Sequence, residues 1–304
     1  MKILSLLLVL VLHSTGLITH LSPTAQDHVA TIGTSSSQAT NITPAAVGLT
    51  FPLPVQMSTE PLVFGATSAI AIDRATGTVL YSKNSGAKLP IASVTKMITA
   101  LVYLSRHDPK EQITVPVLPA YPQAAEIMGL VPGDTFTARE ILQAALVPSD
   151  NDAADTLAIS DAGSVAKFAA RMNQKMTEWG ISDTRFVSAS GLQDEGNYAS
   201  ATALSRIAAL VMTNPTFAEL VKLPRITLTS GEGRSYNLTS TNALLASGLF
   251  YGIKTGYTQA AGECFVGLTR INDHEVITVV LGSNNRFGDT TALTNWIGHS
   301  WQWL

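Results

Sequence analysis

The sequence contains a single cysteine, Cys264, so the chain cannot form an internal disulfide. No cysteine lies near the N-terminus, which excludes a lipid-modified N-terminus of the lipoprotein type. We expect Cys264 to be a small buried residue rather than a reactive thiol. His107, His274 and His299 are scattered without the spacing of metal ligands, so we predict no metal and no cofactor.

Charge is also scarce. Only 13% of the 304 residues are charged, and the formal net charge at pH 7 is −3. Nucleic-acid binding normally needs a basic face, so we expect no nucleic-acid partner. The hydrophobic fraction of 46% is typical of a globular protein, and the length allows one large domain or two modest ones. The sequence contains no internal repeats.

The N-terminus carries the main long apolar run. Lys2 is followed by ILSLLLVLVL, which is roughly half the length needed to span a bilayer, and then by small residues at Ser14 and Gly16. This pattern is typical of a secretory signal, and the alternative is an uncleaved anchor continuing to Leu21. We therefore expect residues 1–21 to be a signal peptide or N-terminal anchor. The protein would be exported to the periplasm or to the extracytoplasmic face of the cell membrane, with any membrane tether through the N-terminus only.

Residues 22–63 are rich in Ser, Thr, Pro, Ala and Gln, carry almost no charge and show neither helical nor strand periodicity. This composition predicts a linker. We expect one folded domain over residues 64–304, beginning near Phe64.

The apolar pattern of this domain predicts strands at both of its ends and helices between them. The expected fold class is α/β (α+β), with an antiparallel sheet flanked by helices and a lobe made only of helices. The expected strands are 68–73, 78–83, 252–256, 263–271 and 274–283. The expected helices are 91–104, 139–147, 152–159, 165–179, 201–212 and a closing helix at 289–304.

A Ser-x-x-Lys pattern occurs three times, and its context separates the copies. Ser85 lies in a polar loop, and Ser164 begins a helix whose polar face would hold Lys167 in water. Ser93 instead opens an apolar helix, which places Lys96 one turn from its hydroxyl. A partly desolvated lysine has a lowered pKa and can take a proton from serine. The alternative is a capped helix with a surface lysine.

A Ser-x-Asn pattern occurs four times, but only Ser149 and Asn151 lie between two predicted helices. Pro148 ends one helix and the next begins at once, so both side chains are expected on a rigid corner. A hydroxyl there can relay a proton and an amide can bind a peptide bond. Ordinary helix capping is the alternative interpretation.

A Lys-Thr-Gly run occurs once, at Lys254, Thr255 and Gly256. A positive charge and a hydroxyl suit the binding of a carboxylate, and glycine lets the backbone approach a ligand closely. A lysine at a strand edge followed by a turn is the alternative.

Together, S-V-T-K, S-D-N and K-T-G resemble the motifs of the penicillin-binding proteins and serine β-lactamases. The longer runs PIASVTKMITAL, LVPSDNDAADTLA, DTRFVSASGL and GIKTGYTQAAGECFVGLT resemble the low-molecular-mass D-alanyl-D-alanine carboxypeptidases and their D,D-endopeptidase relatives. The resemblance covers residues from about Phe64 onward. It implies a β-lactamase/transpeptidase-like fold, with peptidoglycan stem peptides as substrates and β-lactam antibiotics as inhibitors.

The resemblance also implies roles for the motif residues. Ser93 would attack the penultimate carbonyl and form an acyl-enzyme, with Lys96 as its base. Ser149 would pass the proton to the leaving amine, and Asn151 would hold the substrate amide.

On the binding side, the resemblance implies that Lys254 and Thr255 grip the terminal carboxylate of the peptide. Gly256 and Tyr257 complete the substrate-binding strand, and the backbone N–H groups of Ser93 and Tyr257 would form the oxyanion hole.

The sequence departs from the family pattern at Thr202-Ala203-Leu204-Ser205, where the family often has T-A-R-D. We expect neither the further C-terminal β domain nor the amphipathic helix of many carboxypeptidases, and in this the sequence looks more like the short endopeptidase branch. The main expectation is a serine-type D-Ala-D-Ala carboxypeptidase in cell-wall biogenesis and remodelling. The alternatives are a D,D-endopeptidase that cleaves crosslinks, a class A type β-lactamase, and a non-catalytic penicillin-binding sensor. The lactamase needs a glutamate in an E-x-x-L-N run, which is absent between S-D-N and K-T-G.

Overall fold

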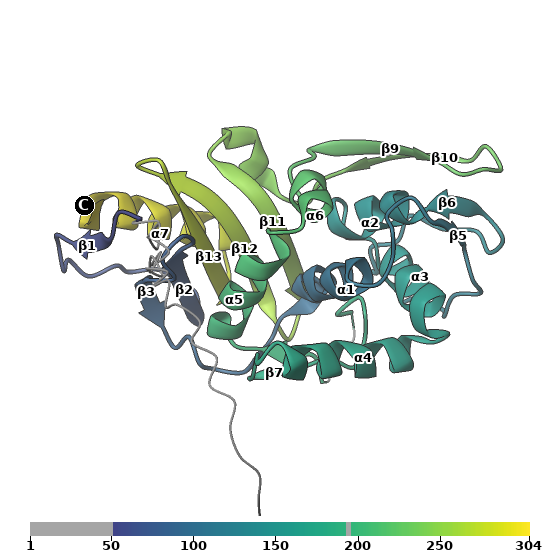
Figure 1. Cartoon of the computed structure of the whole chain (residues 1–304), viewed down its shortest axis with the longest axis horizontal. Helices are drawn as coiled ribbons and strands as arrows, with labels where there is room; N and C mark the ends of the chain where they lie inside the picture. Colours follow the sequence, from purple (N-terminus) through teal and green to yellow (C-terminus); the bar gives the residue numbers. More distant parts are fainter. Residues whose placement is uncertain (1–50, 193–195) are drawn as a thin grey trace, which may run out of the picture. The chain divides into compact units, whose positions relative to one another are not determined.

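Two strands from near residue 70 and three from after residue 250 join in one antiparallel sheet of five strands, in the order β11-β12-β13-β2-β3 (Figure 1). The computed structural model describes residues 51–192 and 196–304. The distant pairing is made by β13 and β2, where Val279 lies opposite Ile70. The strands are β2 (Ser68–Asp73), β3 (Val79–Lys83), β11 (Phe250–Thr258), β12 (Gly262–Ile271) and β13 (His274–Ser283).

The strands alternate between two apolar layers, so both faces of the sheet are covered. In β13, Ile277 belongs to the main core, whereas Val276 packs with Leu293 and Ile297 in a second cluster. Helix α7 (Arg286–Ser300) covers this second face, and α5 (Ala201–Val211) packs on the first.

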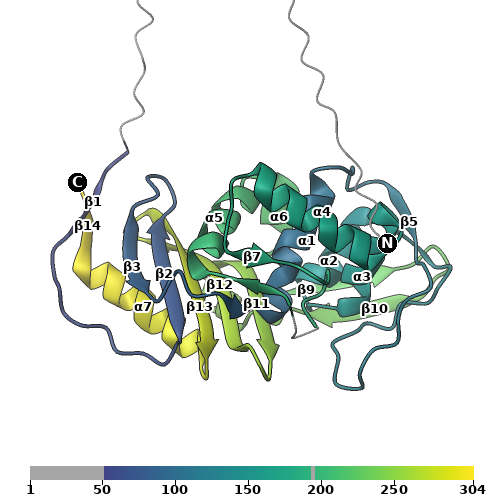
Figure 2. The same cartoon turned by 90° about the horizontal axis from the view of Figure 1, so that it is seen from below.

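The remaining helices form a second group beside β11, the edge strand of the sheet, as both ribbon views show (Figures 1 and 2). Helix α1 lies at the centre of this group, and all but one of its residues are buried. The helices are α1 (Thr95–Leu104), α2 (Ala138–Leu146), α3 (Asn151–Ala162), α4 (Val165–Glu178) and α6 (Pro215–Leu220). The predicted helical lobe is therefore present, and the antiparallel sheet flanked by helices is confirmed.

The helical lobe also carries short strands that the sequence pattern did not predict. Two two-stranded sheets, β5-β6 and β9-β10, and a small three-stranded sheet in the order β4-β8-β7 belong to it. The strands are β4 (Leu89–Pro90), β5 (Gln112–Thr114), β6 (Thr135–Thr137), β7 (Thr184–Arg185), β8 (Tyr198–Ala199), β9 (Arg225–Thr229) and β10 (Ser235–Thr239). Most of them have two or three residues, too few to show a period of two.

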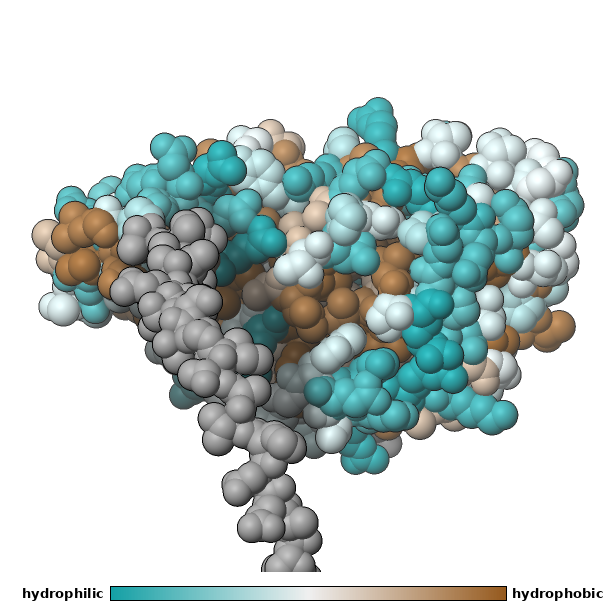
Figure 3. All heavy atoms as spheres, viewed as in Figure 1, coloured by the Kyte–Doolittle hydropathy of each residue, from teal (hydrophilic) through white to brown (hydrophobic). Residues whose placement is uncertain are grey.

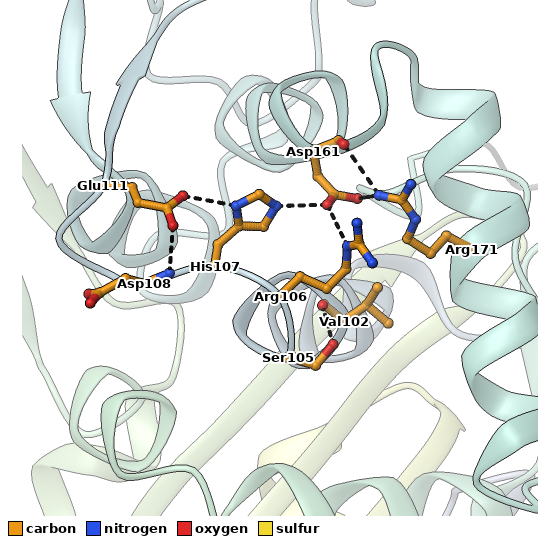
Figure 4. Close-up of polar contacts among 8 residues, drawn as sticks. All are labelled: Val102, Ser105, Arg106, His107, Asp108, Glu111, Asp161 and Arg171. Carbon is orange, nitrogen blue, oxygen red and sulfur yellow. Dashed lines mark hydrogen bonds and ion pairs between the residues drawn. The ribbon is translucent and has the colours of Figure 1, made fainter.

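A polar cluster joins the ends of α1 and α3 to the middle of α4 (Figure 4). The Asp161 carboxylate accepts a hydrogen bond from Arg106 Nε at 2.9 Å, lies 2.7 Å from His107 Nε2, and pairs with Arg171. Glu111 contacts the other ring nitrogen of His107 at 2.9 Å. This set of five residues, called here the Asp161 cluster, holds α1 and α3 together at the ends opposite to their motif residues.

The structure differs from the sequence prediction at both ends of the folded region. Strand β1 (Pro54–Gln56) lies in the expected linker and pairs with β14 (Trp301–Trp303), which lies in the expected closing helix (Figure 2). The helix ends at Ser300 because the next residues adopt extended backbone. Neither strand is predictable from local pattern, since each has three residues and depends on the other. The expected signal and most of the linker lie outside the described residues.

Several apolar side chains at and beside β1 remain exposed, namely Phe51, Leu53, Val55 and Met57. Figure 3 shows apolar surface at the corresponding end of the molecule. Within residues 51–192 and 196–304, no helix combines the length and apolar character needed to cross a membrane.

Candidate active site

The residues of the three motifs meet at a cleft between edge strand β11 and the helical lobe. The cleft encloses a volume of about 160 Å³. Its walls include six of the predicted site residues: Ser93, Ser149, Asn151, Thr255, Gly256 and Tyr257. Lys96 and Lys254 lie behind this wall, hydrogen-bonded to the two serines. The structure thus brings all eight predicted residues together.

Ser93 lies in a short 3₁₀ turn, η1 (Ala92–Val94), which runs directly into α1. The sequence predicted that Ser93 opens the α-helix itself, and the structure corrects this by one tight turn. Ala92, the preceding residue, has φ of 47°, a left-handed conformation that costs about 1 kcal/mol for a non-glycine residue. The turn leaves Ser93 half-buried at the cleft while its neighbours Ala92 and Val94 are buried.

Lys96 is fully buried, and its ammonium or amine has three partners. Nζ lies 2.7 Å from Ser93 Oγ, 2.8 Å from Asn151 Oδ1 and 2.9 Å from the Ser190 carbonyl oxygen. None of these partners is a carboxylate. Burial therefore dominates and lowers the pKa of Lys96 to about 7, although the more distant Asp155 and Asp150 act to raise it. Close to neutral pH, a large fraction of Lys96 is a free base beside the Ser93 hydroxyl.

Ser149 and Asn151 occupy the corner between α2 and α3, as predicted. Ser149 has φ of 76°, and the Asn151 backbone N–H and side-chain Nδ2 both donate to the carbonyl oxygen of Glu126, each at 2.8 Å. The corner is thus held from outside the motif by the loop that contains Glu126. Helix capping, the alternative interpretation, does not describe the corner, because the Asp150 N-cap makes no side-chain capping bond.

Lys254 is also buried and contacts the corner rather than the open cleft. Its Nζ donates to Ser149 Oγ at 2.7 Å and to the Thr255 carbonyl oxygen at 3.1 Å. Burial and the nearby charges of Lys96 and Arg286 hold the pKa of Lys254 well below its usual value. Arg286 lines the cleft and Lys254 lies behind its wall, and their positive charge favours an anionic ligand there.

Gly256 is required because β11 passes directly over the η1 turn. A Cβ atom at Gly256 would lie 2.8 Å from the Ile91 carbonyl oxygen and 3.1 Å from the Ser93 nitrogen. This close approach brings β11 at Gly256 against the Ser93 backbone, and Tyr257 is the next residue along the strand. The Tyr257 side chain is 64% exposed at the rim of the cleft.

The structure adds three groups that sequence analysis did not identify. The Ser190 carbonyl reaches Lys96 from the 188–192 loop, where Gly191 fits because its Cβ would clash with the Ala92 carbonyl oxygen. Thr241 Oγ1 lies 2.5 Å from Thr255 Oγ1, and Arg286 lines the cleft and donates from its Nη1 to the Gly256 carbonyl at 2.9 Å. No local pattern marks these residues. The quoted run DTRFVSASGL was the one available signal, for the loop alone.

The rejected copies of Ser-x-x-Lys are placed as the sequence suggested. Ser164 is the N-cap of α4 and accepts a hydrogen bond from the Lys167 backbone N–H. Lys167 is exposed, so its amine is solvated and cannot act as a desolvated base. Cys264 is buried and burial raises the pKa of its thiol to about 11, which is consistent with a packing residue.

Comparison with known families gives a match over most of the folded region. The model of the D-alanyl-D-alanine carboxypeptidase family, peptidase S11, matches residues 55–285. The chain is 32% identical to the D-alanyl-D-alanine carboxypeptidase DacF of Bacillus subtilis over 235 residues, covering 74% of this chain but only 59% of DacF. It is 33% identical to a D-alanyl-D-alanine endopeptidase of Pseudomonas aeruginosa over 241 residues, 76% of either chain.

Solved structures agree with these sequence matches. The DD-transpeptidase of Streptomyces K15 superposes with a TM-score of 0.71 at 30% identity, covering 79% of this chain and 99% of the other. Penicillin-binding protein D2 of Listeria monocytogenes, in its ampicillin-bound form, superposes with a TM-score of 0.68 at 31% identity, covering 80% of this chain and 100% of the other. The β-lactamase/transpeptidase-like fold class is confirmed.

Proposed function

The chain belongs to the D-alanyl-D-alanine carboxypeptidase family of serine peptidases, and from this premise we propose that it removes the terminal D-alanine from peptidoglycan stem peptides through an acyl-enzyme on Ser93. The observation that carries the proposal is the 2.7 Å contact between the Ser93 hydroxyl and a buried lysine whose pKa is lowered to about 7. A serine is a weak nucleophile unless an adjacent base activates it.

In the proposed acylation step, neutral Lys96 Nζ takes the proton of Ser93 as Oγ attacks the carbonyl carbon of the penultimate D-alanine. The oxyanion that forms accepts hydrogen bonds from the backbone N–H groups of Ser93 and Tyr257. The C–N bond then breaks, and the proton that Lys96 accepted passes through Ser149, whose hydroxyl Lys254 holds in place, to the leaving amine. Water later attacks the ester and releases the shortened peptide and the free Ser93 hydroxyl.

The terminal carboxylate of the substrate would lie at the end of the cleft formed by β11. Thr255 and Arg286 line the cleft there, whereas Lys254 is almost fully buried behind them. We therefore assign direct contact with the carboxylate to the Thr255 hydroxyl and the Arg286 guanidinium. Lys254 contributes its positive field through Thr255 and Ser149.

The same site suits β-lactam antibiotics, which would acylate Ser93, and the ampicillin-bound relative supports this partner. The proposed substrate of this protein belongs to the cell wall, so the proposed place of action is the extracytoplasmic side of the membrane. Cleavage of a D,D-crosslink is the second candidate, supported by the relative named as an endopeptidase.

The test is digestion of purified monomeric and crosslinked muropeptides, with the products identified by mass. We expect loss of one alanine from monomers with a pentapeptide stem. Conversion of dimers to monomers without such loss would assign the endopeptidase activity instead.

Ser93→Ala is expected to abolish both product formation and covalent labelling by a fluorescent penicillin. Persistent labelling would contradict the nucleophile assignment. Rapid turnover of the penicillin would indicate a lactamase, and no labelling of the wild-type protein would indicate a non-catalytic sensor.

A further inference from the structure

A second cavity of about 440 Å³ adjoins the catalytic cleft. We call it the Asp155 pocket; it is lined mainly by apolar residues, including Tyr121, Pro122, Val165 and Leu192. Leu192 also lines the catalytic cleft, so the two spaces share this residue. Ser190, whose carbonyl oxygen contacts Lys96, lines the pocket as well.

Among the residues that the structure describes, one charged side chain lines this mostly apolar pocket. Asp155 is 5% exposed, and its Oδ2 accepts a hydrogen bond from the Tyr121 hydroxyl at 2.9 Å. Its Oδ1 has no hydrogen-bond partner among the residues that the structure describes. A buried carboxylate oxygen without a partner is costly, and such a group at a pocket wall is explained when a ligand supplies the missing donor.

The neighbouring Asp152 shows how a buried carboxylate in this helix is satisfied by the protein itself. Asp152 is one turn away on the same helix, and its carboxylate accepts from the backbone N–H groups of Met128, Gly129 and Leu130. Asp152 therefore has a structural role, fixing the loop before β6. Burial raises the pKa of Asp155 to about 6, so at neutral pH the pocket still holds a mostly ionised carboxylate.

The position of Asp155 along α3 indicates which part of a substrate reaches it. Ser149, just before the helix, is bonded to Lys254, and Asn151, its first residue, is bonded to Lys96. Asp155 follows one turn later, about 6 Å farther along the helix axis. Along α3, the contact with the carboxylate-binding end of the cleft therefore comes first, the contact with the reacting centre comes second, and the pocket comes last. The pocket lies on the side of the acyl group, beyond the reacting serine from the leaving D-alanine.

We propose that the Asp155 pocket binds the side-chain ammonium of the residue that precedes the penultimate D-alanine, so that the enzyme selects stem peptides whose diamino acid has a free amine. The apolar walls would take the methylene groups of that side chain, and Asp155 Oδ1 would accept a charge-assisted hydrogen bond from its ammonium. This inference rests on the proposed function, because it names the substrate class of the same site.

The test compares three synthetic peptides that differ only in one side chain: Nα-acetyl-Lys-D-Ala-D-Ala, the same peptide with an acetylated ε-amine, and the norleucine analogue. We expect wild-type kcat/KM to be roughly tenfold or more higher for the free amine than for either neutral peptide, the size of one hydrogen bond to a charged group. D-alanine release without such a preference would overturn the inference and leave the proposed function intact. Absence of release from all three, with no penicillin labelling, would instead count against the proposed function.

Asp155→Asn keeps the shape of the side chain and removes its charge. We expect it to reduce the ratio of kcat/KM for the free amine and norleucine peptides to near one, while the norleucine peptide is still cleaved. Removing the Asp155 charge also changes the pKa of Lys96, but this change affects both peptides equally and cancels in the ratio. The matched control is Asp183→Asn, which removes a surface carboxylate paired with Lys88 and should leave the ratio at the wild-type value. An unchanged ratio in Asp155→Asn would overturn the proposal. If this variant does not fold, the wild-type comparison of the three peptides decides it alone.

Discussion

Helices α1 and α3 carry a polar cluster at each end, and the two clusters are built on opposite principles. At the far end, the buried Asp161 carboxylate is surrounded by Arg106, His107 and Arg171 (Figure 4). Burial alone would raise the pKa of Asp161, but the hydrogen bonds with His107, Arg106 and Arg171 lower it below the usual value. Its negative charge is thus matched, and the cluster holds the helices together.

At the near end, Lys96 has hydrogen-bond partners but no paired carboxylate, and burial lowers its pKa from 10.5 to about 7. The unfolded lysine holds its proton up to about pH 10, whereas the folded one loses it near pH 7. The buried amine therefore costs stability throughout the neutral range, and the cost disappears only above the unfolded pKa. The comparison teaches that a buried charge with partners of opposite charge stabilises the fold, whereas a buried amine without such a partner indicates a catalytic site.

The largest expected effect comes from removing the unmatched base. Lys96→Met should lower the rate of Ser93 acylation by about 10³-fold, because the serine loses its general base and the side chain keeps its volume. Lys96→Arg is the matched control and should be equally inactive, since guanidinium stays protonated. Stopped-flow labelling with a fluorescent penicillin gives the rate. Near wild-type labelling of Lys96→Met would contradict the base assignment.

Next in size is Lys254→Ala, which removes the second buried lysine. We expect kcat/KM for a peptide with a free terminal carboxylate to fall on the order of 100-fold. For an ester analogue without the carboxylate, the fall in kcat/KM should be about tenfold smaller. This analogue needs a positioned Ser149 but does not use the anion site. Equal losses on both substrates would refute a role in carboxylate capture.

A smaller effect is expected from Thr241→Val, which removes the hydroxyl 2.5 Å from Thr255 Oγ1 but keeps the shape of the side chain. Losing one neutral hydrogen bond should lower kcat/KM for carboxylate substrates roughly fivefold. The ester analogue serves as the internal control. No change with either substrate would remove Thr241 from the site.

The smallest effect on activity is expected from the matched cluster. Asp161→Asn should leave the rate of acylation within about twofold of wild type. It should destabilise the protein by about 2 kcal/mol, less than the loss of a fully buried ion pair, because water can still solvate the partly exposed Arg106 and Arg171. Because the folded pKa of Asp161 is lowered, its contribution is present above the usual aspartate pKa and is lost in acid. Thermal unfolding at pH 7 and at pH 3 measures this, and an unchanged melting temperature at pH 7 would contradict the structural role.

The catalytic residues can be predicted from the sequence because they lie within short runs of the chain. Ser93 and Lys96 are three positions apart, and helical geometry alone brings them together. The five main strands and the principal helices follow from apolar periodicity, as in α1 and β13.

The rest depends on contacts between distant segments, which periodicity does not report. Arg286 reaches the cleft because α7 begins where β13 ends, 30 residues after Gly256. The pairing of β1 with β14 joins residues more than 240 positions apart. The Asp155 pocket similarly needs four separate parts of the chain, namely residues 119–122, α3, α4 and residues 188–192, and Asp155 alone is an ordinary polar residue on a helix.

The central claim is that Lys96 acts as a neutral base because it is buried without a paired charge, and the pH dependence of Ser93 acylation tests it most directly. The account predicts that the acylation rate rises with pH and reaches half of its maximum near pH 7, in the wild type and in Asp161→Asn alike. A rate that does not change between pH 5.5 and pH 9, or one that rises only near pH 10 as for an ordinary lysine, would contradict it.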